Sequence, residues 1–488
     1  MTAKKKSQST VSRSPILSKQ WLSKQLVPEK LFLLIGLVFG LTFVFVFPPM
    51  QSPDEQTHFY KAYQTAEFNL FPDRFTENGV VRYGAKLPKS VYDESRIFLE
   101  PVAGKPTITF NTSLYRDRLD TPLEKSKTKM VGNEAGNVYS PVVYTPQAAG
   151  IKLGSLLNAS PLILIWLGRI ANLMVWLTLG YLALRLIPFA KWGLFVLLLN
   201  PVAVSLSASL SGDVMSIGLA FVFVSFVFWL AARKIPATTK EIAALSCLGV
   251  GLVLTKPTNI LLLPALLLIP AKVFGKPARK YLVGGAIVLV AVALGLLWNV
   301  GNKELLETAV QLQRPGAGVD PTRQLHYIFS NPLTYVWTIV TNFILVFAGS
   351  SADAVLSTYV GIFGWLDTSI PLWTQITYLV TLCIAMLFQF GRGFVFSSFH
   401  KLFLIAIFAA MFVASVTAMY LNWTPVGARI FEGVQGRYFM PASILLLGVF
   451  TGKKKLIDNY DKQVQIGIVL MICLVLGVSL LKIFARYY

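Results

Sequence analysis

The residues best suited to chemistry lie just after the first long apolar segment, in the stretch Phe47–Tyr60. If this stretch is helical, Asp54 and His58 are four residues apart and share one face, which places a carboxylate and an imidazole where membrane meets water. Such a pair suits base catalysis. The carboxylate of Asp54 could accept a proton from a hydroxyl, while His58 or Glu55 orients it or helps to bind the substrate.

The same residues also suit a helix N-terminus. Ser52 with Glu55 matches a capping box, Pro53 fits the first helical position, and Asp54 in the first turn complements the helix dipole. Structural needs alone could explain all four residue types. From spacing alone, both interpretations stay open.

Three cations, Arg169, Lys256 and Arg437, lie within or beside apolar segments. Each such charge costs roughly 2.5–3.5 kcal/mol to insert, so a retained one usually has a partner or a ligand. We predict phosphate binding first for Arg437, because the planar guanidinium fork suits a phosphate. The alternative is snorkelling to headgroups or pairing with a carboxylate, for which the candidates are Asp213, Asp367 and Glu432.

Two of these carboxylates are also candidate substrate-binding residues. Asp213 follows Ser211-Gly212 at a predicted outer turn and begins an apolar run, so helix capping explains it as well as sugar contact does. Asp367 ends the stretch Gly364–Asp367, in which Trp365 is typical of a membrane-interface anchor.

The elements that must position these residues are membrane helices. Of 488 residues, 55% are apolar and 14% charged, with a mean hydropathy of +0.61, a balance that excludes a soluble fold. About 20 apolar residues cross a bilayer core. After a first span at about 31–48, the hydropathy pattern predicts spans near 160–187, 191–209, 213–232, 241–255, 257–272, 281–299, 333–350, 373–391, 401–421, 437–451 and 464–484.

The net charge of +21 does not indicate nucleic-acid binding, because the basic residues gather in short loops between apolar segments. These clusters are Lys4–Lys30, Arg233–Lys240, Lys272–Lys280, Arg392–Lys401 and Lys453–Lys455. Residues 51–140 carry twelve acidic and twelve basic side chains. The positive-inside rule therefore predicts that this long loop is extracytoplasmic and that the N-terminus is cytoplasmic.

These patterns predict an all-α polytopic membrane protein with four parts. Residues 1–30 form a basic cytoplasmic tail, 31–50 the first transmembrane helix, 51–140 an extracytoplasmic loop that begins with a helix, and 141–488 a polytopic region. The short apolar stretch 354–366 decides the side of the later loops. If it crosses, every basic loop is cytoplasmic and the C-terminus is outside, and the charge rule favours this crossing. The three cysteines lie in apolar segments without disulfide or metal spacing.

The stretch Pro53–Phe59 resembles the P-D-E-x-x-H signature of a bacterial membrane family known as domain of unknown function 2142. Further stretches resemble the same family: Tyr139–Gln147, Ser207–Asp213, Lys256-Pro257, Gly364–Asp367 and Gly433–Pro441. Together they run from about residue 30 to residue 450. The family is itself similar to the C-type glycosyltransferases, and the D-E-x-x-H-F pattern at Asp54–Phe59 is also similar to that of protein mannosyltransferases.

This resemblance implies a helical bundle of about 11–13 transmembrane helices with a long first extracytoplasmic loop. It implies transfer of a sugar from a polyprenyl-phosphate carrier to an envelope glycan, cell-wall polymer or other acceptor outside a bacterial plasma membrane. Asp54 is then the general base and Glu55 a catalytic neighbour. Substrate-binding roles fall to His58, Arg169, Asp213, Lys256, Asp367 and Arg437.

The second acidic motif of metal-dependent C-type enzymes is not recognisable in residues 60–140, so the sequence indicates no metal site and leaves a cofactor open. Two alternative functions remain. A transporter or flippase of lipid-linked sugars also places buried charges along its path. A non-catalytic membrane protein of envelope assembly is the other.

Overall fold

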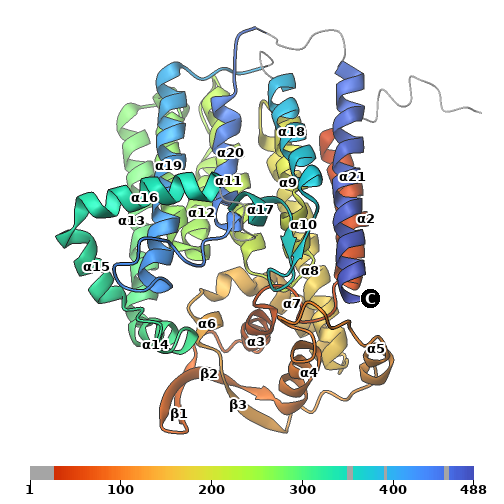
Figure 1. Cartoon of the computed structure of the whole chain (residues 1–488). Coiled ribbons are helices and arrows are strands. Elements are labelled where there is room, and N and C mark those ends of the chain that lie inside the picture. The colour runs from red at the N-terminus through yellow and green to blue at the C-terminus, as the bar shows by residue number, and fades with distance from the viewer. Residues whose placement is uncertain (1–26, 349–354, 390–392, 455–460) are drawn as a thin grey trace, which may run out of the picture.

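The computed structural model describes residues 27–348, 355–389, 393–454 and 461–488, so most of the expected N-terminal tail lies outside the described residues. The chain forms a bundle of helices with a mixed cap, residues 47–160, at one end (Figure 1). Below, the "cap end" is the end of the bundle that carries this cap. The expected all-α polytopic membrane fold is confirmed.

Within the described residues, six helices are long and apolar enough to cross a membrane. They are α2 (Pro28–Val46), α8 (Pro161–Leu186), α11 (Asp213–Ala232), α13 (Pro277–Gly301), α19 (Ser398–Asn422) and α21 (Asp461–Tyr487). Shorter helices complete the bundle: α9 (Lys191–Leu198), α10 (Pro201–Ser207), α12 (Thr239–Thr255), η2 (Pro257–Leu268), η3 (Ala271–Phe274), α18 (Leu372–Gln389), η4 (Gly436–Phe439) and α20 (Met440–Val449).

Side-chain caps mark where several of these helices begin. The Ser160 side chain accepts from the Ile163 N–H at the start of α8. Thr238 and Glu241 form a reciprocal capping box at the start of α12, which satisfies two backbone donors that the first turn leaves free. These two helices therefore start at residues whose side chains replace the missing intrahelical bonds.

The span predicted at 191–209 does cross the bundle, from Lys191 beside Glu29 at the start of α2 to Leu210 beside Glu55 of the cap, but it is not one continuous helix. The segment is two short helices, α9 and α10, that meet at Asn200-Pro201. Proline has no N–H and its ring disfavours helical backbone at the preceding residue. The Asn200 side chain then caps α10 by accepting from the Val202 and Ala203 N–H groups.

The segments predicted at 333–350 and 354–366 do not cross the bundle. Helix α16 (Pro332–Ala348) lies across the other helices (Figure 1). After it, α17 (Val355–Val360) and a hairpin of β4 (Ile362–Phe363) and β5 (Thr368–Ser369) are far too short to span a bilayer. Because both predicted crossings are absent, the sides of the later loops are unchanged, and the C-terminus lies at the cap end as expected.

The cap is an α/β structure built on three antiparallel strands in the order β1-β2-β3. Strands β1 (Asp73–Glu77) and β2 (Val80–Pro88) join through Asn78-Gly79, both with positive φ, which matches the twist of a tight hairpin. The other cap elements are α3 (Glu55–Ala66), α4 (Lys89–Leu99), α5 (Ser113–Arg118), β3 (Thr128–Gly132), α6 (Glu134–Asn137), η1 (Pro141–Tyr144) and α7 (Thr145–Leu156).

The end of α21 and the short helices α14 (Lys303–Gln313) and α15 (Pro321–Ser330) also lie at the cap end. The Phe110 N–H donates to the Tyr487 carbonyl at 2.6 Å, and the Tyr115 and Tyr488 hydroxyls lie 3.0 Å apart. Arg486 donates to the Ile108 carbonyl at 2.8 Å. The last helix therefore fixes the cap to the bundle.

Helix α3 carries a fully buried lysine, Lys61, whose ammonium donates to Asn137 Oδ1 at 2.8 Å and to the Leu70 carbonyl at 3.0 Å. Both acceptors are neutral. Burial lowers the pKa of Lys61 to about 7. The lysine links α3 to α6 and to the turn before β1, so the cap's packing depends on a group that titrates near neutral pH.

We expect the stability of the protein to rise between about pH 7 and about pH 10, since the unfolded chain still binds this proton there and the folded chain does not. The gain is at most about 1.4 kcal/mol per pH unit. Thermal unfolding in detergent should therefore show a smaller rise with pH for Lys61→Met than for the wild type. Equal slopes for the two proteins would contradict the assignment.

Candidate active site

The site lies where the cap meets the bundle, and it begins at the turn between α2 and α3. Helix α2 ends at Val46, before Pro48-Pro49, which cannot continue it. The capping box predicted for Ser52 and Glu55 is wrong. Helix α3 begins at Glu55, and Asp54 precedes it with a left-handed backbone (φ 58°) and no side-chain cap bond.

Asp54 and Asp213 both face the guanidinium of Arg437. Asp54 Oδ2 lies 3.4 Å from Arg437 Nη2, and Asp213 Oδ2 lies 3.6 Å from Arg437 Nη1. The Arg437 side chain is 8% exposed and that of Asp54 is 55% exposed. A buried cation therefore joins an open carboxylate to a second carboxylate at the start of α11.

Arg437 is incompletely satisfied within the protein. Its Nε and Nη1 atoms are buried and have no hydrogen-bond partner. Buried guanidinium donors without acceptors are costly, so a ligand or an ordered water has to satisfy them. An anion with several oxygens, such as a phosphate, would suit these donors.

Close backbone packing fixes the position of Arg437. The Gly436 N–H donates to Thr358 Oγ1 at 2.7 Å, and a Cβ atom at Gly436 would lie 2.3 Å from both the Tyr359 nitrogen and the Val355 carbonyl oxygen. Only glycine allows this approach of η4 to α17.

Lys256 supplies a second cation to the same region. It lies in extended backbone between α12 and η2, and its Nζ is 4.4 Å from the centroid of the Tyr438 ring. The charged groups that act on it are Asp213 and Arg437. Two carboxylates and two cations thus balance at this site.

His58 is close to Asp54 in sequence but is held in the cap. It is 9% exposed, and its Nδ1 lies 2.8 Å from the Tyr144 hydroxyl. Burial lowers the pKa of His58, against the opposing effect of the Asp54 charge. At neutral pH the imidazole is therefore uncharged, and it lies on the cap side of the site.

Glu55 and Arg169 form an ion pair in which both side chains are fully buried. Arg169 Nε donates to Glu55 Oε1 at 2.8 Å and Nη2 donates to Oε2 at 2.7 Å. The remaining donors of Arg169 bond to carbonyl oxygens after the end of α2 and within its last turn: Val44, Phe47 and Pro48. The partner of Arg169 is thus a carboxylate that the sequence analysis assigned to catalysis.

Asp367 lies outside this group. Its Oδ2 pairs with Arg486 Nη2 at 3.0 Å, and both side chains are largely buried. The contact joins the β4–β5 hairpin to α21. The structure thus brings together Asp54, Asp213, Lys256 and Arg437, with His58 behind them, whereas Asp367 and Arg169 are engaged in other ion pairs.

Sequence reasoning missed Tyr144 and Tyr438, the aromatic partners of His58 and Lys256. Both lie in stretches that resemble the family, within Tyr139–Gln147 and Gly433–Pro441. For Tyr438 the available signal was its position directly after Arg437, whereas Tyr144 has no predicted site residue beside it in sequence.

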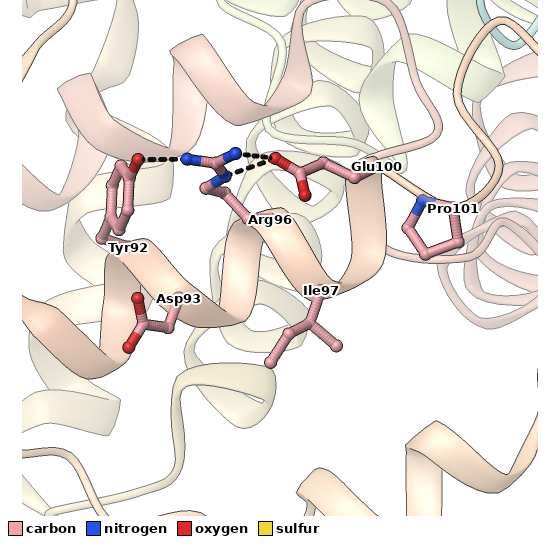
Figure 2. A pocket seen from close by; sticks show the side chains of 6 residues that line it. All are labelled: Tyr92, Asp93, Arg96, Ile97, Glu100 and Pro101. Atoms are coloured by element: carbon pink, nitrogen blue, oxygen red, sulfur yellow. Dashed lines mark hydrogen bonds and ion pairs between the residues drawn. The ribbon is translucent and has the colours of Figure 1, made fainter.

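Two hollows lie near the cap. Figure 2 shows a surface pocket along α4, where Arg96 is engaged by Tyr92 and Glu100. None of the site's charged residues lines it. A smaller cavity is lined by Pro53 and Arg437 together with polar and apolar side chains, which include Leu206, Ile362 and Phe363. The second cavity belongs to the site.

In the described part of the chain, no three His, Cys, Asp or Glu side chains form a group suited to hold a metal ion. Cys247, Cys383 and Cys473 are free thiols on α12, α18 and α21. The donors gathered at the site are cationic, which suits an anion.

We expect Arg169→Met to lower the free energy of unfolding by about 3–5 kcal/mol, because it leaves Glu55 buried without its cationic partner. Chemical unfolding in detergent measures this loss. Arg116→Met is the control: its ion pair with Asp117 is exposed and should contribute less than about 1 kcal/mol. Similar losses for the two variants would show that the buried ion pair stabilises the fold no more than an exposed one.

The chain was compared with known proteins. No curated protein and no solved structure matches it. One family profile, described as "Predicted membrane protein (DUF2142)", matches residues 37–446, a range that includes every site residue named above except Arg486. The resemblance predicted from Pro53–Phe59 is confirmed, and the chain belongs to this family of predicted membrane proteins.

Proposed function

We propose that the protein is a membrane glycosyltransferase that moves a sugar from a polyprenyl-phosphate carrier to a hydroxyl of an envelope glycan or similar acceptor. One observation carries the proposal. Buried N–H groups of Arg437 that have no hydrogen-bond partner lie beside an exposed carboxylate, Asp54. An anion site next to an accessible base suits displacement of a phosphate by a hydroxyl.

In the proposed step, Asp54 accepts the proton of the acceptor hydroxyl. The acceptor oxygen forms a bond to the anomeric carbon, and the bond from that carbon to the carrier phosphate oxygen breaks. The electron pair leaves with the phosphate, whose added charge Arg437 and Lys256 stabilise. A single displacement of this kind inverts the anomeric centre.

The charge balance of the site suits an anionic donor. Arg437 is shared by Asp54 and Asp213. A donor phosphate would compete with Asp54 for the guanidinium, while Asp213 at the start of α11 keeps it in place. Donor binding would then free Asp54 to act as a base, and Asp213 and His58 would remain to contact or orient the sugar.

The cavity at Arg437 has a volume of about 20 Å³, room for roughly one water molecule, so it would have to widen to take the lipid part of the donor. It is lined by α10 and the β4–β5 hairpin, which contribute Leu206, Ile362 and Phe363. Arg437 and Pro53 also line it, so an anionic head bound at Arg437 would lie beside this cavity.

The basic loops support an extracytoplasmic site. The clusters at Arg233–Lys240 and Lys272–Lys280 join bundle helices at the end opposite the cap, which the positive-inside rule assigns to the cytoplasm. The cap and Asp54 would then face outward from a bacterial plasma membrane.

A flippase of lipid-linked sugars is the second candidate, because the broken pair α9 and α10 resembles the discontinuous helices of transporters. Val202, Ser205 and Leu206 of α10 line the cavity at Arg437. A flippase would need Arg437 but would not need a base at Asp54.

We expect cells with Asp54→Asn at wild-type abundance to lack the same envelope sugar as cells without the protein. Mass spectrometry of envelope glycans measures this. Asp93→Asn, an acidic residue beside the α4 surface pocket, is the control and should leave the glycans unchanged. If Asp54→Asn matches the wild type while the deletion does not, the flippase becomes the better proposal.

A second experiment tests the anion site directly, with farnesyl phosphate as the probe and farnesol as its uncharged control. Charged hydrogen bonds contribute about 1.5–3 kcal/mol, so Arg437→Gln should weaken farnesyl phosphate binding roughly 10- to 150-fold in calorimetry. Arg233→Gln is the control: this partly buried arginine follows the end of α11 and pairs with Glu241. The variant should bind farnesyl phosphate as the wild type does. Binding that is equal for the phosphate and the alcohol would exclude the anion site.

A further inference from the structure

We infer that Glu55 and Arg169 are positioning residues that hold Asp54 and Asp213 in register across the site, without contacting substrate. The inference rests on the proposed function of Asp54 as a base. It revises the direct roles that the sequence suggested for both residues, and it follows from how their hydrogen bonds are used.

Arg169 has no donor left for a ligand. A guanidinium carries five N–H groups. All five have acceptors here, two of them the oxygens of Glu55 and the others the carbonyls of Val44, Phe47 and Pro48. The side chain is fully buried. This contrasts with Arg437, whose Nε and Nη1 have no hydrogen-bond partner.

Both carboxylate oxygens of Glu55 also accept hydrogen bonds within the protein. Its Oε1 accepts from Arg169 Nε and also from the Leu210 N–H at 3.2 Å, and its Oε2 accepts from Arg169 Nη2. A carboxylate with these bonds and no exposed surface cannot serve as a base for a substrate from solvent.

These bonds connect the two carboxylates of the site. Glu55 directly follows Asp54, and Leu210 lies three residues before Asp213. The bond from Leu210 to Glu55 therefore sets the start of α11 against the turn that carries Asp54. Arg169 sets the same turn against the end of α2 through the Phe47 and Pro48 carbonyls.

Asp54 needs such support because its own backbone and side chain do little to fix its position. It adopts the left-handed region, which non-glycine residues seldom occupy, and its side chain makes no cap bond. Its carboxylate is more than half exposed. The restraint on its position comes from the neighbouring peptide through Glu55. A shift of about 1 Å in a catalytic group can lower a rate about 100-fold.

The test uses the full-length protein in cells that lack the native copy, with variants at equal abundance. The double variant Glu55→Gln/Arg169→Gln removes both charges together, so neither is left buried alone. Glu94→Gln/Arg118→Gln is the matched control, because Glu94 is also fully buried and Arg118 lies 2.7 Å from it, in the cap and outside the site. Asp54→Asn reports on the proposed function itself.

Three quantities are measured for each variant: the unfolding temperature in detergent, farnesyl phosphate binding, and the rate at which the missing sugar enters envelope glycans. For Glu55→Gln/Arg169→Gln we expect binding within about threefold of the wild type and a rate about 100-fold lower. The control pair should keep the wild-type rate even if its unfolding temperature falls. A purely structural role would lower the rate only in proportion to folded protein.

The outcomes separate the two proposals. If Asp54→Asn is inactive and Glu55→Gln/Arg169→Gln transfers sugar at the wild-type rate, the positioning inference is wrong and the proposed function stands. Loss of farnesyl phosphate binding in the double variant, as in Arg437→Gln, would place the pair in the donor site and also overturn it. Wild-type transfer by Asp54→Asn would overturn the proposed function, and the inference with it.

If the double variant does not accumulate, Glu55→Asp decides. Its shorter side chain cannot reach both Arg169 and the Leu210 N–H, so the rate should fall at least tenfold with normal farnesyl phosphate binding. A wild-type rate for a stable Glu55→Asp would overturn the inference.

Discussion

The ion pair between Glu55 and Arg169 is the contact on which the junction of cap and bundle depends. Both charges are removed from water, and desolvation of this kind is repaid only when the remaining donors and acceptors are satisfied. Here the arginine also bonds three carbonyls near the end of α2, and the glutamate accepts a backbone N–H before α11. One buried pair thereby joins α2, α3, α8 and the approach to α11.

Proline and asparagine shape the bundle around this junction. A regular helix satisfies its own backbone in an apolar environment, so a break needs replacement bonds. At Asn200-Pro201 the asparagine supplies them, and its Nδ2 also donates to the Tyr359 carbonyl at 3.0 Å. The backbone of Tyr359 packs closely against Gly436, and this contact positions Arg437. The break in the predicted span is therefore part of the support for the site.

Much of the bundle could be predicted from sequence, because apolar runs of about 20 residues leave few alternatives. The break at Asn200-Pro201 was also readable, since the proline signal is local. The orientation of α16 was not, because its composition matches that of a spanning helix and its direction depends on packing. The side of the C-terminus was predicted correctly, but from two crossings that are both absent.

The site, like the bundle, could be predicted only in part, because local signals can be read from the sequence and packing between distant segments cannot. Residue types at Asp54, Asp213, Lys256 and Arg437 signalled cost or chemistry locally, but their partners are distant in sequence: Asp54 and Arg437 are 383 residues apart. The adjacent carboxylates Asp54 and Glu55 illustrate the limit. Asp54 is 55% exposed and lies beside Arg437, two of whose nitrogen atoms have no hydrogen-bond partner. Glu55 is fully buried against Arg169, whose donors are all hydrogen-bonded.

The three cations expected to bind phosphate divide in the same way. A cation in an apolar segment needs either a protein partner or a ligand, and the sequence does not distinguish these two solutions. Arg169 has the first, with every N–H engaged, and Arg437 has only long contacts to two carboxylates. The number of donors left unsatisfied, and not burial or charge alone, is therefore what separates a residue that builds the site from one that awaits a substrate.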